Sequence, residues 1–151
     1  QGEGNGIETL VYRPHSGSLT VSAAAAAALG EDASSVLADQ TQLQAKLDVI
    51  SAAKFGVHRM QLPSGTTVRE YVSPAGMVFA VSWQGPAMPD LQQVLGRYFQ
   101  AYVEAVKSAG GARTMRQPGL VVQTGGHMRA YFGRVFVPPM LPQGVSAEEI
   151  Q

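Results

Sequence analysis

Two short segments of this chain are near-copies of one tight turn, and they constrain the fold more than any other feature. Both place a proline, a small residue and a glycine in succession, at 63–65 and at 74–76. Proline presets the backbone for the first loop position, and glycine accepts the left-handed conformation at the third, so each segment predicts a three-residue hairpin loop with a glycine bulge. The flanking stretches, 55–62, 66–73 and 77–83, are rich in residues that favour strands. The sequence therefore predicts a three-strand antiparallel meander, because such loops are too short for a crossover.

Counting outward from each loop predicts which strand residues lie opposite one another. The count pairs His58 with Glu70 and places Ala80 beyond Glu70 on the third strand. It also pairs Arg59 with Arg69. One face of the meander is predicted to hold Phe55, Val57, Tyr71, Met77, Phe79, Val81 and Trp83, and the other Met60, Val68, Val72, Val78 and Ala80. Both faces are apolar enough to need cover.

Two helices are predicted to supply that cover. Residues 33–53 carry apolar side chains at helical spacing on one narrow stripe, which fits a core-covering helix or, as a functional alternative, a partner-binding one. A second helix is predicted over 91–106, where Asp90 is a good N-cap and the apolar stripe fills about half of the circumference. Gly96 lies in its interior at a cost of about 1 kcal/mol against alanine, which points to a close approach to another element.

A last hairpin is predicted near the end of the chain. Gly125 and Gly126 separate two strand-like runs, 120–124 and 127–137, and predict a two-residue turn between them. The predicted order is α-β-β-β-α-β-β. This is an α+β fold with an antiparallel sheet of about five strands, a three-strand meander plus a hairpin, covered by two helices.

The first residues differ in character from the rest of the chain. Residues 1–30 are irregular, and an alanine run at 23–28 resembles the small-residue end of a secretory signal, without the apolar core expected upstream. No apolar run approaches the roughly 20 residues needed to span a bilayer. We expect an exported protein, periplasmic or secreted, with an irregular leader over 1–30, a single α+β domain over 31–140 and a loosely held tail over 141–151.

The distribution of charge is more informative than its total. Eleven Lys and Arg balance eleven Asp and Glu, which argues against a dedicated nucleic-acid binder. Residues 55–140, however, hold eight basic and only three acidic side chains. Such a basic central body would attract an anionic polymer, a lipid headgroup or an acidic partner, or it is a solvated face that contacts the acidic first helix. The absence of cysteine excludes disulfides, thiolate metal sites and cysteine nucleophiles.

Few residues are candidates for chemistry. His58 beside Glu70 is the nearest approach to an acid–base pair, and the same pairing is also an ordinary cross-strand contact. No metal-ligand spacing, phosphate-binding loop or nucleophile motif is present, so the sequence predicts no metal and no cofactor. The weak candidates for ligand binding are Arg69, Tyr71, Trp83, His127 and Arg129, because arginines close to aromatic residues can stack on a ligand and Trp83 ends a strand where a groove can open.

Several segments together resemble an uncharacterised family of small exported proteobacterial proteins, a domain of unknown function. They are residues 62–76, 78–86, 88–91, 95–99 and 125–130, and the likeness covers roughly residues 29–150. The resemblance implies a bacterial protein with a signal peptide and supplies no activity or site. We predict a small, exported, non-catalytic binding or accessory protein with an unknown protein or small-molecule partner. A hydrolase using His58 and Glu70, and a binder of anionic polymers or nucleic acid, are the alternatives.

Overall fold

A computed structural model of the chain describes residues 29–151, so nearly all of the predicted leader lies outside the described residues. Three helices, seven strands and three short 3-10 turns follow along the chain. They are α1 (Ser35–Gln42), β1 (Lys46–Ser51), β2 (Gly56–Gln61), β3 (Thr67–Val72), β4 (Val78–Gly85), α2 (Leu91–Leu95), η1 (Gly96–Tyr98), α3 (Phe99–Lys107), β5 (Thr114–Gln117), β6 (Leu120–His127), β7 (Ala130–Phe136), η2 (Pro138–Met140) and η3 (Ala147–Glu149). The α+β class is confirmed, whereas the estimate of about five strands is too low.

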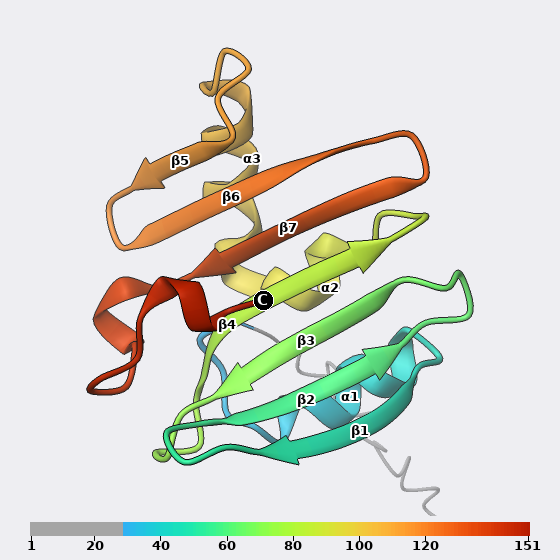
Figure 1. The fold of residues 1–151 in the computed structure, drawn as a ribbon, viewed down its shortest axis with the longest axis vertical. Helices are drawn as coiled ribbons and strands as arrows, with labels where there is room; N and C mark the ends of the chain where they lie inside the picture. Colours follow the sequence, from blue (N-terminus) through green and yellow to red (C-terminus); the bar gives the residue numbers. More distant parts are fainter. Residues whose placement is uncertain (1–28) are drawn as a thin grey trace, which may run out of the picture.

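All seven strands form one antiparallel sheet in the order β1-β2-β3-β4-β7-β6-β5 (Figure 1). Its first half is a meander with the two predicted turns at its corners. Gly65 and Gly76 adopt the left-handed conformation there, with φ of 91° and 83°. Their N–H groups donate to the carbonyls of Leu62 and Ser73, at 3.0 and 2.8 Å. The second half, β5 to β7, joins the first through the pairing of β4 with β7.

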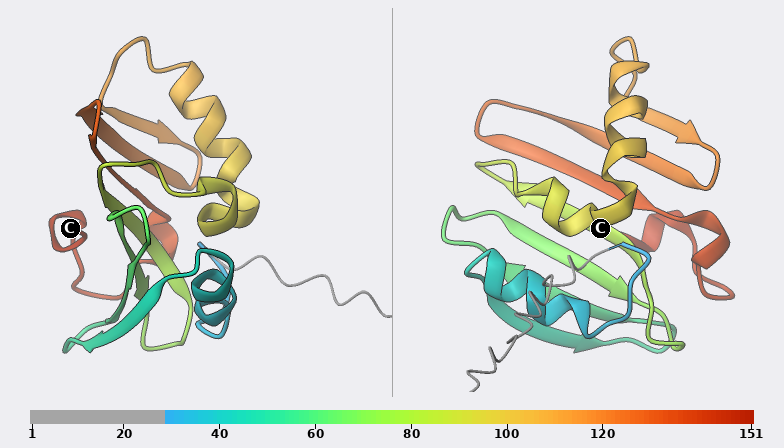
Figure 2. Two further views of the ribbon diagram at one scale, coloured as in Figure 1. Left: turned by 90° about the vertical axis from the view of Figure 1, so that its right-hand side faces the viewer. Right: turned by 180° about the vertical axis from the view of Figure 1, so that it is seen from behind.

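The two faces of the sheet are covered differently. The helices pack on one face, and the segment after β7 crosses the other (Figure 2). We call these the helix face and the open face. The helix face carries the main core, in which Val68, Val81 and Trp83 pack beneath helical residues such as Val36 and Val94. A smaller cluster on the open face comprises Tyr71, Phe79, Ala80, Val121, Phe136 and Ile150.

The prediction of one long helix over 33–53 is wrong. The helix α1 ends at Gln42, Gln44 adopts a left-handed φ of 52°, and the chain continues as the edge strand β1. In β1 Leu47 lies opposite Met60 of β2 and packs on the helix face. The apolar positions fit both a helix and a strand over this stretch, and the available partner strand decides between them.

The second predicted helix is divided rather than continuous. Asp90 is its N-cap as predicted, and its Oδ1 accepts a hydrogen bond from the Gln93 N–H at 3.1 Å. At Gly96, however, φ is 49°, and the chain passes through η1 before α3 begins at a new angle (Figure 2). Glycine makes this break possible because it accepts positive φ without a Cβ clash. The single helix over 91–106 is therefore wrong, although the prediction that the segment covers the sheet holds.

The prediction of a turn at Gly125 and Gly126 is also wrong. Both glycines lie within β6, and the turn is formed by Met128 and Arg129, between the paired residues His127 and Ala130. Arg129 supplies the positive φ, 66°. Gly126 serves a different purpose, since a Cβ there would overlap the backbone carbonyl of Ala130. The strand β5 was not predicted.

The predicted register holds for the first pair of strands and slips by one residue in the next. His58 lies opposite Glu70 and Arg59 opposite Arg69, as predicted. A bulge beside Tyr71 then shifts β4, so Glu70 faces Val81 rather than Ala80.

The bulge changes which residues share a face. Because a one-residue shift moves side chains to the other side of a strand, Val81 and Trp83 face the helices, while Ala80 joins Phe79 on the open face. The predicted row of Tyr71, Phe79 and Trp83 is therefore wrong for Trp83.

Candidate functional site

The open face carries a polar row that runs from strand to strand across most of the sheet. Residues opposite one another in an antiparallel pair point to the same face, so the register defines the row. Three arginines belong to it: Arg59 on β2, Arg69 on β3 and Arg134 on β7. In order across the sheet, the row is Asp48, Arg59, Arg69, Ser82, Arg134 and Gln123. This row collects side chains from both halves of the chain.

The C-terminal segment crosses the sheet beside this row. The side chain of Ile150 is fully buried in the open-face cluster. The Arg134 guanidinium donates to the carbonyls of Ala147 and Ile150, both at 2.6 Å, and to the Gln123 side-chain oxygen. The Ser82 hydroxyl donates to the carbonyl of Gln151 at 2.5 Å. We expected residues 141–151 to be loosely held, and the structure instead packs them against the sheet.

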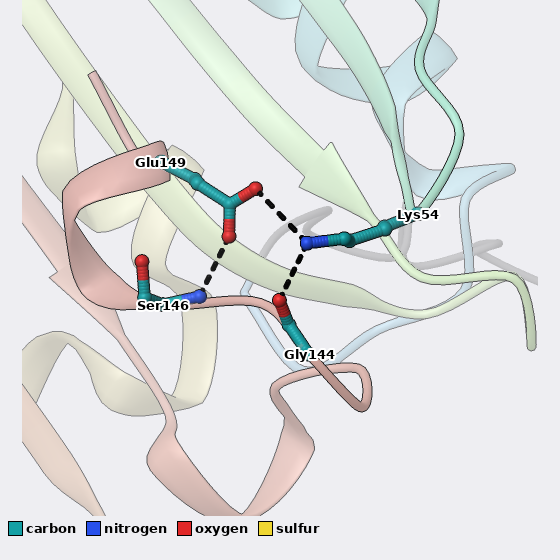
Figure 3. Close-up of polar contacts among 4 residues, drawn as sticks. All are labelled: Lys54, Gly144, Ser146 and Glu149. Carbon is teal, nitrogen blue, oxygen red and sulfur yellow. Dashed lines mark hydrogen bonds and ion pairs between the residues drawn. The ribbon is translucent and has the colours of Figure 1, made fainter.

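A polar clasp fastens the same segment at its other end. The Lys54 ammonium group, in the loop between β1 and β2, donates to the Gly144 carbonyl at 2.7 Å and lies 3.6 Å from the Glu149 carboxylate (Figure 3). The other oxygen of Glu149 accepts from the Ser146 N–H at 2.7 Å, which completes a capping box for η3. Exposed ion pairs contribute little free energy, so the clasp mainly fixes the path of the backbone.

A hollow opens where the C-terminal segment stops covering the sheet. It has a volume of ≈ 350 Å³. Phe132 forms part of its wall with its side chain 46% exposed, and the ring lies across Gly125, where a Cβ would overlap it. The lining residues are Trp83, Gln84, Gln123, Phe132, Gly133, Arg134, Ile150 and Gln151. We call this the Phe132 hollow.

A second hollow adjoins the first at the tip of the last hairpin. Its volume is ≈ 430 Å³, and it shares Gln84 and Phe132 with the Phe132 hollow. His127, Arg129 and Tyr131 form the rest of its polar and aromatic lining. The two hollows adjoin each other at Gln84 and Phe132.

The helix face contains a buried acidic pair. Glu70 of β3 and Asp39 of α1 are both fully buried. An Asp39 oxygen accepts from the Gln93 side-chain amide at 2.6 Å, whereas neither Glu70 oxygen makes a well-formed hydrogen bond within residues 29–151. Burial raises the pKa of Glu70 well above its usual range, and the neighbouring Asp39 carboxyl raises it further. Burial and the neighbouring carboxyl group therefore both favour the protonated, neutral form of Glu70.

The structure does not bring the sequence-predicted site residues together into one site. His58 shares the helix face with Glu70 and is only partly buried, and burial lowers its pKa. His127 and Arg129 both line the second hollow, at the tip of the last hairpin.

The remaining three candidates do not come together. Arg69 lies in the polar row. Tyr71 is covered by the C-terminal segment, its hydroxyl donating to the Gln151 carbonyl at 2.6 Å. The Trp83 ring packs edge-on against Tyr102 on the helix face, with ring centroids 6.2 Å apart. Trp83 is nevertheless among the residues that line the Phe132 hollow, so its role in ligand binding stays a prediction.

Sequence reasoning missed Gln84, Phe132 and Arg134 as site residues. The alternation along 128–136 does place Phe132 and Arg134 on one strand, but only the long-range pairing of β4 with β7 brings them beside Gln84. Within the described part of the chain, no group of three or more potential ligands is placed to hold a metal ion. None of its helices has the length and apolar character to cross a membrane.

Comparison with known families gives a match over most of the chain. Residues 25–150 match the model described as "Protein of unknown function (DUF2844)". The chain belongs to the DUF2844 family. The resemblance to a domain of unknown function is thereby confirmed, and the whole of the sheet of this DUF2844 chain falls within the matched range. No match was found among curated proteins or among solved structures.

Proposed function

We propose that this DUF2844 protein is a non-catalytic binding protein whose ligand lies in the Phe132 hollow of the open face. The observation that carries the proposal is the half-exposed ring of Phe132 in the wall of an open hollow. An apolar surface with a few polar groups around it is the usual composition of a small-ligand site.

The polar groups of the hollow indicate the ligand's chemistry. Arg134 and Gln123 already bond to each other and to the C-terminal backbone. Gln84 is exposed, and its side-chain amide makes no hydrogen bond within residues 29–151, so it is free to donate and to accept. A free amide beside an aromatic ring suits an uncharged polar ligand with one apolar face, such as a sugar ring or a peptide unit.

The lining of the hollow favours binding over catalysis. Its described residues include no histidine, aspartate or glutamate. General acid–base catalysis needs a titratable group within hydrogen-bond reach of the substrate. The hydrolase alternative requires Glu70 to reach a substrate, and Glu70 lies fully buried beneath α1.

Export to the periplasm or beyond remains part of the proposal. It is supported by the alanine run at 23–28 and by the resemblance to exported proteins drawn from the sequence. The family match itself assigns no compartment.

Titration of the ¹⁵N-labelled chain tests the proposal, with N-acetylglucosamine disaccharide and a capped dipeptide as probes. We expect one probe, at concentrations up to about 10 mM, to shift the Gln84 side-chain amide and the Phe132 backbone signals saturably. Phe132→Ala should abolish the shifts. Met128→Ala is the matched control, because Met128 is exposed on the same hairpin and lies outside the lining of the Phe132 hollow. Saturable binding that Phe132→Ala leaves unchanged, or shifts confined to other surfaces, would refute the site.

A further inference from the structure

Two arginines face each other directly on the open face, which is an unfavourable arrangement for a sheet on its own. Arg59 and Arg69 are cross-strand partners in the antiparallel pair of β2 and β3. Like charges directly opposite each other destabilise a sheet. Asp48 offsets one of them, with its carboxylate 2.6 Å from the Arg59 guanidinium. Arg69 makes no ion pair or hydrogen bond among the described residues, and its other cross-strand neighbour, Ser82, is uncharged.

A hollow of ≈ 350 Å³ lies over this pair of arginines, and we call it the Arg69 hollow. Its lining adds Lys46, Gln61 and Thr67 to the two arginines and Asp48. The neutral donors are already in use, because the Thr67 hydroxyl donates to the Gln61 side-chain oxygen at 2.9 Å and the Gln61 amide donates to the Gly65 carbonyl at 3.2 Å. The free donors are therefore cationic: the guanidinium of Arg69 and the ammonium of Lys46.

From this arrangement we propose that the Arg69 hollow is an oxyanion-binding site, best matched to a phosphate group. Three cations and one carboxylate leave the hollow with an excess of two positive charges, and a phosphate monoester carries about 1.5 to 2 negative charges at pH 7. A guanidinium presents N–H groups in a planar fork that can hold two oxygens of one phosphate. A bound oxyanion also removes the repulsion between Arg59 and Arg69, so the unfavourable pairing is explained as a feature of the ligand-free state.

The site is distinct from the Phe132 hollow and stands independently of the function proposed there. The two hollows meet where Thr67, at the border of one, lies opposite Gln84 in the other. Phe132→Ala should therefore leave phosphate binding unchanged, which separates a failure of one proposal from a failure of the other.

The test is a titration of the ¹⁵N-labelled full chain with inorganic phosphate, at constant ionic strength set with chloride. We expect saturable shifts of the Arg59 and Arg69 Nε–H signals. Arg69→Gln should weaken binding at least tenfold, and Arg69→Lys, which keeps the charge and loses the fork, should fall between Arg69→Gln and the wild type. Arg116→Gln is the matched control, because Arg116 is exposed on β5 at the opposite edge of the sheet. Shifts no larger than those caused by chloride, or equal affinity in Arg69→Gln, would overturn the proposal.

Thermal unfolding supplies a second readout that does not depend on signal assignment. Without phosphate, Arg69→Gln should melt at a higher temperature than the wild type, because it removes the repulsion with Arg59. With phosphate, the wild type should gain more stability than Arg69→Gln does. Glycerol phosphate, a monoester of similar charge, identifies the source of the group: tighter binding than inorganic phosphate indicates a phosphate carried on a longer ligand, and equal or weaker binding indicates a free ion. A lower melting temperature for Arg69→Gln with an undiminished response to phosphate would contradict the inference.

Discussion

Replacing Glu70 by glutamine tests whether the buried acid of the helix face is protonated in the folded protein. Glutamine has nearly the same shape and stays neutral at every pH. The folded pKa of Glu70 is raised by burial and by Asp39, whereas the unfolded chain titrates near the ordinary value of 4.5. Above that pH, the folded state therefore holds a proton that the unfolded state has released.

The sign and size of the effect follow from this difference in bound protons. The contribution of Glu70 to stability is complete below about pH 4.5 and is lost as the pH rises toward the folded pKa. One proton changes the free energy of unfolding by at most about 1.4 kcal/mol per pH unit. For a domain of this size, that corresponds to a change in Tm of roughly 3–5 °C per pH unit.

The assay is urea or thermal unfolding of both proteins across the range from mildly acidic to mildly alkaline pH. We expect Glu70→Gln to gain stability over the wild type as the pH rises. Burial lowers the pKa of His58, whose contribution has the opposite pH dependence, and taking the difference between the two proteins cancels it. Glu104→Gln, on the exposed surface of α3, is the control and should give a flat difference. A flat difference for Glu70→Gln as well would refute the protonated state.

Two further pairs of substitutions test the packing on each face. Gly133→Ala should lower the free energy of unfolding by about 1–3 kcal/mol, because the new methyl group overlaps the buried Trp83 ring. Gly125→Ala meets only the half-exposed ring of Phe132 and should cost less stability. Urea unfolding compares the two variants, and equal losses of stability would contradict this account. Ile150→Ala should lower the free energy of unfolding by about 2–5 kcal/mol, because the side chain is fully buried. Met128→Ala, at a position 82% exposed, is the control and should change stability by less than about 0.5 kcal/mol. A small loss for Ile150→Ala would show that this buried side chain does not hold the C-terminal segment on the sheet.

Features that depend on a few neighbouring residues were predictable from the sequence. The loops around Gly65 and Gly76 need only a proline and a glycine at the right spacing, and the register of His58 with Glu70 follows from counting across one short loop. The cap at Asp90 is equally local. In each of these cases, the interactions that decide the local structure are made by residues close together in the sequence.

Features that depend on distant partners were not predictable in the same way. The segment around Leu47 becomes a strand because β2 is available to pair with it. The bulge beside Tyr71 moves Trp83 to the helix face although no single residue there demands it. The candidate site is the extreme case, since Arg134 lies beside Ser82 only once the two halves of the sheet have joined.

The junction between β4 and β7 has a consequence for how the chain reaches its native state. Every other pair of neighbouring strands is also adjacent in sequence, and those hairpins can form early from local contacts. The junction instead brings Val81 to Val135 across the helical segment, β5 and β6, which carries a larger entropic cost of loop closure. We therefore expect β1–β4 and β5–β7 to form separately, and we expect their docking through the β4–β7 pair to set the rate of folding.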